Sequence, residues 1–268
     1  MENYENRIVL FLDILGFKKI IEETVLKKKN SVENEIIEKT TFLIDTINEM
    51  TKVASITLKD TSKIVTQFSD SIVISFRADD RNEISKLFHN IQRLIAQLIA
   101  REVLCRGAIS YGKLYHKNNL IFGPALVDAY ETESQAALYP RIILDKTVLD
   151  IMKFNYSYGN KHSYAKIRFE VDTNAYLKID TDDKYYIDYF TGTMMFFENK
   201  ELFDIYLKFR KLIINGLRFK NPNIYIKYGW MKNKYNKIPE MLEQINEDED
   251  LFDKRPDIKK LYDEFKQI

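Results

Sequence analysis

The chain has 268 residues, of which 45% are hydrophobic, enough to bury a full core in one large domain or in a domain with an extension. Its 41 basic and 40 acidic residues leave a net charge of +1, which argues against a nucleic-acid-binding or membrane-binding surface. The single cysteine excludes an internal disulfide and a cysteine-based metal centre. Without a long apolar run or a signal-peptide pattern, the chain is expected to be cytoplasmic.

Strand and helix patterns alternate along the first half of the chain. Asp13 alone interrupts the apolar run over residues 7–14, which is typical of a strand buried on both faces. A hairpin is predicted around Ser69 and Asp70. The other elements predicted here are helices at 17–29, 31–50 and 80–101, and strands at 62–68 and 71–76.

The second half begins with a glycine turn at Gly112, which is expected to separate strands at 104–111 and 112–121. Further predicted elements are a helix from Gly123-Pro124 to about 138, a strand at 141–144, a helix at 146–152, strands within 163–190, a helix at 200–220 and an acidic C-terminal helix. This order predicts an α+β fold, a two-layer sandwich with a mainly antiparallel sheet and flanking helices. We expect a catalytic core over residues 1–150 and a C-terminal α/β extension over 151–268 packed on it.

Two aspartates stand where apolar strands end or turn. Asp13 lies inside FLDIL, where a carboxylate is costly to bury without a partner, and Asp70 lies between two apolar strands. Taken singly, Asp13 is also explained as a cap on the next helix and Asp70 as turn chemistry. If the first strand lies between the arms of the sheet, the two carboxylates converge into an oxygen-ligand site suited to Mg²⁺ or Mn²⁺ with a polyphosphate.

The chain after Asp13 opens a helix. The free backbone N–H groups of Ile14, Leu15, Gly16 and Phe17 would form a cradle for phosphate there. Two divalent ions beside such a cradle can activate a hydroxyl and stabilise a leaving pyrophosphate. The pattern therefore predicts chemistry on a polyphosphate substrate.

Four segments resemble class III nucleotidyl cyclases. FLDILGFKK resembles their first metal motif and FSDSIVISF their second, while RGAISYG and FGPALVDAYETES resemble the later strand pair and the helix that carries the transition-state groups. The resemblance covers about residues 7–145. It is closer to the Pycsar pyrimidine cyclases of bacterial anti-phage defence, which share FLDILGF, Ser-Asp-Ser at the second metal motif, RGAI and FGPAL.

The resemblance carries expectations about the site and its products. It implies a metal set of Asp13, Ile14 and Asp70 that holds two Mn²⁺ or Mg²⁺ ions. It also implies a homodimer with sites at the interface, UTP or CTP as substrate, and a 3′,5′-cyclic pyrimidine nucleotide and pyrophosphate as products. A downstream effector that responds to the cyclic nucleotide is implied as well. The uridylate cyclase is the preferred expectation, although the residues do not decide between uracil and cytosine.

The purine-reading pair of the wider family is missing. The purine cyclases that this chain resembles carry a lysine and an aspartate where Thr66 and Leu120 stand here. A site built for one set of donors rejects the wrong partner, so the change favours a pyrimidine. Lys63, Thr66 and Gln67 are the candidate base-edge residues. Tyr130 either stacks on the base or sugar or packs in the core.

Two transition-state groups of the family's late helix are also replaced, by Val127 and Glu131. Charge on the triphosphate still requires neutralisation. Arg106 is the predicted catalytic substitute, with Lys113 or Lys18 assisting. A sheet-edge salt bridge is an equal alternative for Arg106.

Other functions fit part of the pattern. Without the late-helix arginine, the chain can be an inactive cyclase-like nucleotide-binding or scaffold protein, although intact Asp13 and Asp70 argue against this. A purine cyclase is another alternative. A polymerase-palm enzyme shares the two-aspartate logic but fits the FGPAL helix poorly.

Overall fold

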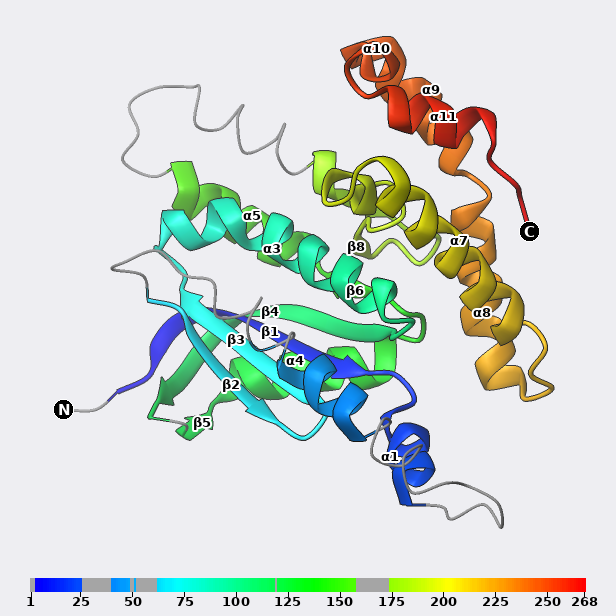
Figure 1. Cartoon of the computed structure of the whole chain (residues 1–268). Helices are drawn as coiled ribbons and strands as arrows, with labels where there is room; N and C mark the ends of the chain where they lie inside the picture. The colour runs from blue at the N-terminus through cyan, green and yellow to red at the C-terminus, as the bar shows by residue number, and fades with distance from the viewer. Residues whose placement is uncertain (1–2, 26–39, 49–50, 52–61, 119, 158–173) are drawn as a thin grey trace.

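The computed structural model describes residues 3–25, 40–48, 51, 62–118, 120–157 and 174–268 (Figure 1). Of the predicted helix over 31–50, residues 40–48 are helical, and residues 31–39 and 49–50 lie outside the described part. The predicted strands before residue 174 lie outside it as well. No helix of the described residues is long and apolar enough to span a bilayer.

One eight-stranded sheet runs through the molecule, in the order β2-β3-β1-β4-β6-β8-β7 with β5 beside β4. Its strands are β1 (Glu5–Ile14), β2 (Ile64–Phe68), β3 (Ser71–Arg77), β4 (Cys105–Lys117), β5 (Leu120–Phe122), β6 (Ile142–Leu144), β7 (Leu177–Ile179) and β8 (Tyr185–Ile187). Among the described strands every pair is antiparallel except β4 with β6. The predicted α+β class with a mainly antiparallel sheet is therefore confirmed.

Helices cover both faces of this sheet. In Figure 1, α3 and α5 lie on one side of the strands and α4 lies on the other. The helices of the described residues are α1 (Phe17–Val25), α3 (Arg81–Ala100), α4 (Pro124–Ala136), α5 (Lys146–Ser157), α7 (Asn199–Gly216), α8 (Pro222–Tyr235), α9 (Ile238–Glu249), α10 (Leu251–Lys254) and α11 (Pro256–Asp263), besides residues 40–48 and the 3-10 turn η1 (Gly192–Met195).

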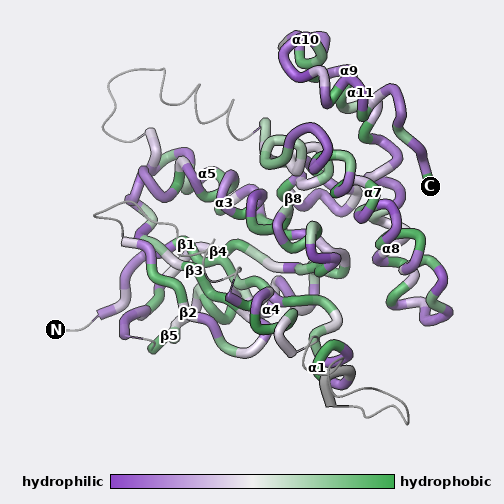
Figure 2. Tube along the Cα trace, viewed as in Figure 1, coloured by the Kyte–Doolittle hydropathy of each residue, from purple (hydrophilic) through white to green (hydrophobic). Residues whose placement is uncertain are grey.

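The strand β1 is buried on both sides because its alternate residues enter different cores. Ile8, Leu10 and Leu12 belong to the large core that includes α3. Val9 and Phe11 belong to a smaller core under α4. All five side chains are at most 5% exposed, which explains the near-continuous apolar run. Figure 2 shows hydrophobic residues gathered on the central strands and hydrophilic ones prevailing on the outer helices.

Most predicted turns and helix starts are confirmed. β2 and β3 form the predicted hairpin, with Ser69 and Asp70 at its tip. α3 begins after Asp80, whose carboxylate accepts a hydrogen bond from the backbone N–H of Glu83 and so caps the helix. α4 begins at Pro124, directly after the predicted glycine.

The predicted turn at Gly112 is wrong. β4 runs without a break from Cys105 to Lys117, and the chain turns only before the short strand β5. A Cβ atom at Gly112 would lie 3.4 Å from the Cβ atom of Ala125 in α4. The glycine therefore permits close packing of a helix on a strand, and not a change of chain direction.

The C-terminal segment extends the same sheet. β8 pairs with β6, and β7 pairs with β8, so strands after residue 150 continue the layer begun by β1. Side chains of α7 and α8, among them Phe209 and Trp230, belong to the same large core as Ile8. The division at residue 150 into a core and an extension stays a prediction.

A substitution at Gly107 tests the close strand packing. A Cβ atom there would lie 2.5 Å from the Phe11 carbonyl oxygen and 3.3 Å from Leu12 Cα, both on the neighbouring backbone. We expect Gly107→Ala to lower the free energy of unfolding by about 1–3 kcal/mol, measured by chemical denaturation. Gly229→Ala is the control, because nothing lies within 4 Å of that Cβ position in α8, and it should stabilise the protein by up to about 1 kcal/mol. Equal effects of the two changes would contradict the packing argument.

Candidate active site

Asp13 occupies the end of the central strand, between the two strands that flank β1. It lies opposite Ser71 of β3 and Arg106 of β4. The Ser71 hydroxyl donates a hydrogen bond to Asp13 Oδ1 at 3.2 Å, and Arg106 Nε lies 4.0 Å from Asp13 Oδ2. Asp70 precedes Ser71 in the hairpin, and its carbonyl oxygen accepts a hydrogen bond from the Ile14 N–H at 3.2 Å. The hairpin and the strand end therefore meet, as the sequence predicts.

The Asp70 carboxylate is close enough to influence the ionisation of Asp13. Burial, together with the negative charge of Asp70, raises the pKa of Asp13 to about 6 against the opposing effects of Ser71 and Arg106. A cation between the carboxylates would relieve both costs. Oxygen ligands without sulfur or imidazole suit Mg²⁺ or Mn²⁺, so the donor set fits the expected metal. No cluster of three or more His, Cys, Asp or Glu residues occurs in the described part of the chain, so backbone and substrate oxygens would complete the coordination.

Arg106 lies at this site but its charge is partly committed. Its Nε atom lies 2.5 Å from Glu133 Oε1, in an ion pair whose alignment is not that of a hydrogen bond. The Glu133 side chain is only 3% exposed. Burial raises the pKa of Glu133, and Arg106 lowers it. The cationic group predicted to act on the triphosphate is thus also the counter-ion of a buried carboxylate.

Glu133 is a site residue that the sequence analysis missed. It lies on α4 four residues after Ala129 and eight after Ala125, and all three are buried. That spacing defines one face of a helix, so an acidic residue on an otherwise apolar stripe was the available signal.

The start of α1 supplies fewer backbone donors than predicted. The Ile14 N–H binds the Asp70 carbonyl oxygen, and the Leu15 N–H binds the Leu104 carbonyl oxygen at 2.8 Å. Neither N–H is free for phosphate, which corrects the prediction for these two residues. The N–H groups of Gly16, Phe17 and Lys18 have no hydrogen-bond partner among the described residues. The cradle therefore begins at Gly16, where a φ of +79° turns the chain into the helix.

Two of the predicted base-edge residues lie on the wrong face of the sheet. Lys63 forms an ion pair with Glu83 of α3 at 3.5 Å, and both side chains are about 5% exposed or less. Gln67 pairs with Ile72, a residue of the core under α3, so it also points away from the face that carries Asp13. Its amide nitrogen donates instead to the Ser69 carbonyl oxygen at 3.1 Å. These two predictions are contradicted because alternation along β2 allows only every second residue to face Asp13.

Thr66 lies on the same side of the sheet as Asp13, and it is the last residue in a series of hydrogen bonds that begins at Arg7. Arg7 Nε donates to Ser75 Oγ at 2.9 Å, and Ser75 Oγ lies 2.7 Å from His116 Nδ1. His116 Nε2 lies 2.8 Å from Thr66 Oγ1. Burial lowers the pKa of His116 to about 4, helped by the positive charge of Arg7, so the ring is neutral.

The direction of this hydrogen-bond chain follows from burial. Ser75 is fully buried and already accepts from Arg7, so its own proton needs an acceptor, which is His116 Nδ1. The neutral ring then carries its proton on Nε2 and donates to Thr66 Oγ1. The proton of the Thr66 hydroxyl remains available for an outside acceptor.

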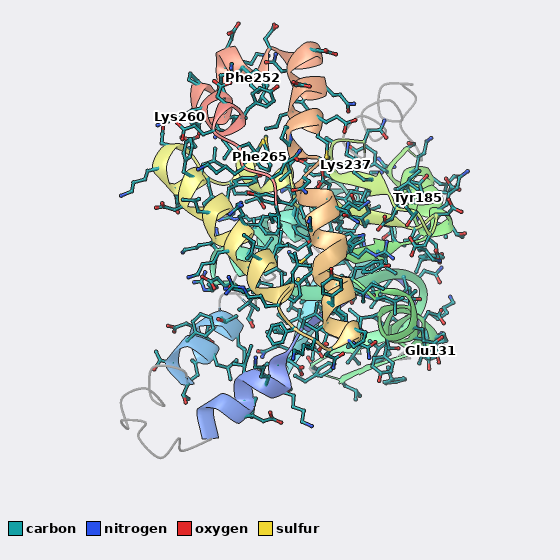
Figure 3. All side chains as sticks on the ribbon, turned by 90° about the vertical axis from the view of Figure 1, so that its right-hand side faces the viewer. Glu131, Tyr185, Lys237, Phe252, Lys260 and Phe265 are labelled. Carbon is teal, nitrogen blue, oxygen red and sulfur yellow. The ribbon has the colours of Figure 1, made fainter. Side chains whose placement is uncertain are left out.

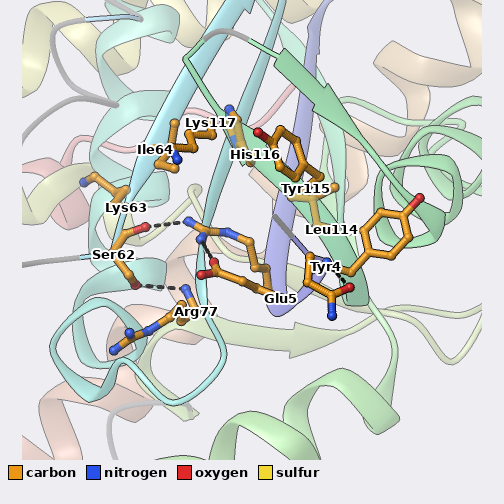
Figure 4. Close-up of a pocket in the computed structure, with 12 residues that line it drawn as sticks. Tyr4, Glu5, Ser62, Lys63, Ile64, Arg77, Leu114, Tyr115, His116 and Lys117 are labelled. Atoms are coloured by element: carbon orange, nitrogen blue, oxygen red, sulfur yellow. Dashed lines mark hydrogen bonds and ion pairs between the residues drawn. The ribbon is translucent and has the colours of Figure 1, made fainter. Parts of the chain in front are cut away.

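The other end of this series of hydrogen bonds, at Arg7, lies at a separate pocket of about 570 Å³, which is drawn in Figure 4. Arg7 lines it, and its guanidinium nitrogens donate to Glu5 and to the Ser62 carbonyl oxygen at 2.5 Å each. Arg7 stands six residues before Asp13 on β1, about 20 Å away at about 3.3 Å per residue. This pocket is therefore no part of the carboxylate site.

Aromatic rings lie beside the carboxylates on the face that carries Asp13. Tyr130 of α4 packs edge-on against Phe11 with ring centroids 5.5 Å apart, and Phe68 lies 6.4 Å from Phe11. Tyr130 is 55% exposed, so its outer side is free within the described residues, and core packing alone does not explain it. Lys113, by contrast, lies seven residues beyond Arg106 on β4, about 23 Å away, so the structure does not bring it to the Asp13 of its own chain, and its assisting role stays a prediction.

No protein-family model and no curated protein matches the chain. Among solved structures, a bacterial light-regulated adenylyl cyclase aligns with a TM-score of 0.40 and 15% identity over 55% of this chain and 45% of that one. An adenylate/guanylate cyclase/hydrolase from Silicibacter pomeroyi aligns with a TM-score of 0.36 and 16% identity over 60% and 83% of the two chains. A class III adenylyl cyclase-like ATP-binding protein from Pseudomonas aeruginosa aligns with a TM-score of 0.40 and 11% identity over 64% and 40%. This chain thus spans less than half of the first and third of these proteins.

The raised pKa of Asp13 predicts a pH-dependent effect of neutralising it. Because the pKa is about 6 in the folded protein against an ordinary 3.8, the cost of ionising this carboxylate in the fold is small near pH 4, grows between about pH 4 and pH 6, and is complete above about pH 6. In chelator-treated buffer we expect Asp13→Asn to raise the free energy of unfolding at pH 8 by about 2 kcal/mol, and by close to nothing at pH 4. Chemical denaturation at both pH values measures this.

The control for this experiment is Asp79→Asn, whose carboxylate is 75% exposed and pairs with Arg77 at the surface. It should show no such pH-dependent gain. A loss of stability in Asp13→Asn that is larger at pH 8 than at pH 4 would contradict the proposed repulsion with Asp70.

Proposed function

We propose that the protein is a nucleotidyl cyclase that converts a pyrimidine nucleoside triphosphate to its 3′,5′-cyclic monophosphate and pyrophosphate. The observation that carries this is the convergence of Asp13 and Asp70 beside the free N–H groups at the start of α1. That combination offers a divalent-cation site next to a phosphate site. The cyclase-like sequence motifs around both aspartates support the same assignment.

In this proposal, different residues of the chain bind the metal ions and the phosphates. Asp13, Asp70 and the backbone of Ile14 hold two Mg²⁺ or Mn²⁺ ions. When bound, the ions supply Lewis-acid activation of the ribose hydroxyl and neutralise charge on the leaving group. The N–H groups of Gly16 and Phe17 bind phosphate oxygens. The ribose 3′ oxygen then bonds to the α-phosphorus as the bond to pyrophosphate breaks, and the hydroxyl proton passes to solvent.

The aromatic rings and Arg106 orient the substrate around that step. Tyr130 and Phe68 offer exposed ring faces near Asp13 on which a base can stack. Arg106 lies 4.0 Å from Asp13 and contributes positive charge where negative charge develops. Its pairing with Glu133 fixes its orientation.

The direction of hydrogen bonding at Thr66 supports UTP over CTP. Its hydroxyl accepts from His116 and is left with a proton to donate. A uracil carbonyl accepts such a hydrogen bond, whereas the exocyclic amino group of cytosine would have to use the one lone pair that His116 leaves on Thr66 Oγ1, and the Thr66 proton would then be unused. Leu120, at the second purine-reading position of the family resemblance, is apolar and 56% exposed, so it offers no partner to a purine amino group.

A homodimer is part of the proposal. Large apolar side chains of β2, β5 and α4 are exposed in the single chain. Each is at least 45% exposed: Phe68, Leu120, Phe122, Val127 and Tyr130. A second copy of the chain would cover them and enclose the nucleotide. The further role in anti-phage signalling, through an effector that responds to the cyclic product, is supported only by the resemblance of the sequence motifs to the Pycsar cyclases.

Product analysis with each of the four nucleoside triphosphates and Mn²⁺ tests the activity. We expect cyclic UMP and pyrophosphate from UTP as the main products. Asp70→Ala should lower turnover by about two orders of magnitude or more while the protein stays folded, because a metal ligand is lost. Cyclic AMP or cyclic GMP as the main product would overturn the pyrimidine assignment. Unchanged turnover in Asp70→Ala would overturn the site.

A paired substitution at Thr66 tests the reading of the base. Thr66→Val removes the donor and should lower kcat/KM for UTP by about tenfold, while kcat/KM for CTP changes less. Thr66→Ser keeps the hydroxyl and should retain the preference for UTP. Steady-state kinetics with both nucleotides measures the ratio, and an unaltered ratio in Thr66→Val would refute the role of Thr66.

A further inference from the structure

The helix α8 brings a lysine from the C-terminal segment to the candidate active site. Lys227 lies on α8 three residues before Trp230 and seven before Lys234, so the three side chains share one face of the helix. Trp230 is buried against the sheet, which turns this face inward. Figure 3 shows α8 crossing in front of the sheet, with Lys237 just beyond its upper end.

A buried carboxylate fixes the position of α8. Asp180 accepts hydrogen bonds from the indole N–H of Trp230 at 2.7 Å and from the Lys234 ammonium at 2.8 Å. Arg141 donates to the same carboxylate at 2.5 Å, and its own carbonyl oxygen accepts from the N–H of Gly107, the residue after Arg106. The helix that carries Lys227 is thus joined to the strand that carries Arg106.

Lys227 lines a groove of about 350 Å³ at the start of α1. One wall carries Leu15 and Gly16, which follow Asp13 and Ile14 in the chain, and Lys19 and Ile20 of α1. The other lining residues are Glu102, Val103, Leu104, Pro140 and Phe219, together with Ile224 and Tyr228 of α8. The groove therefore lies between Gly16 and Lys227, with one acidic residue, Glu102, in its lining.

The Lys227 ammonium has no fixed partner there. Its side chain is half-buried, and among the described residues it forms no hydrogen bond or ion pair. The charges that act on it are those of Arg106, Glu133 and Asp13, with burial the larger effect, and together they lower its pKa. Arg106 is already paired with Glu133, and the Lys19 ammonium lies over the ring of Phe219, 5.0 Å from its centroid.

We propose, on the basis of the cyclase function proposed above, that Lys227 is a substrate-binding residue that holds the polyphosphate of the nucleotide in the groove between α1 and α8. A half-buried cation without a partner gains most from an anion that enters its groove. The N–H group of Gly16, which lines the opposite wall, would bind the same phosphates. This assigns the C-terminal segment a part in the active site, and it supplies positive charge that Val127 and Glu131 do not offer.

Phosphate affinity separates this role from a merely structural one. In the full-length protein, we expect Lys227→Gln to raise KM for UTP and to weaken pyrophosphate binding, measured by calorimetry, by about tenfold each, with a much smaller change in kcat. Binding of uridine, which has no phosphate, should be unchanged. Lys227→Arg should retain most of the pyrophosphate affinity, and Lys237→Gln, an exposed lysine beyond the end of α8, should behave as the wild type.

A double variant tests the alternative that Lys227 serves only to offset the negative charge of Glu133. In that case, Lys227→Gln combined with Glu133→Gln should restore pyrophosphate affinity. In our proposal, the pyrophosphate affinity of the double variant stays weak. Wild-type pyrophosphate affinity in Lys227→Gln would also overturn the inference. Failure of the cyclase proposal looks different, because the wild type would then form no cyclic product from any nucleotide.

Discussion

Burial of the Asp13 carboxylate next to Asp70 is the constraint on which the arrangement of the site depends. A carboxylate at the end of a strand buried on both faces is stable only if neighbouring strands supply compensation. Ser71 supplies a hydrogen bond from one side, and Arg106 supplies positive charge from the other. Arg106 in turn is oriented by Glu133, so charges of opposite sign alternate from the hairpin to α4. An excess of negative charge remains, which the proposed divalent cations would offset.

The same strand that creates this constraint also holds the fold together. Residues of β1 before Asp13 fill two cores in alternation, under α3 and under α4. The position of the carboxylate is therefore set by hydrophobic packing that extends over most of the molecule. The β2–β3 hairpin and β4 are aligned to β1 residue by residue, and this alignment fixes the positions of Asp70 and Arg106 relative to Asp13.

Local patterns predicted much of this arrangement. The buried strand, the hairpin around Asp70 and the helix opened by Pro124 follow from apolar periodicity and turn chemistry, and all are present. Gly112 was misleading because a glycine that admits a close helix looks like a glycine that permits a turn. Lys63 and Gln67 lie on the face of α3 and not on the face of Asp13, because side chains alternate along β2. The place of Lys227 near the site could not be predicted from the sequence, because only the packing of α8 brings this residue near β4.

The Asp180 contacts also make one wall of the groove depend on a carboxylate that lies outside it. Lys227 is carried by α8, and α8 is held by the hydrogen bonds that Trp230 and Lys234 donate to Asp180. The same carboxylate is paired with Arg141, next in the sheet to the strand that carries Arg106. A substitution at Asp180 would therefore displace a wall of the groove from a distance, without changing any residue that lines it.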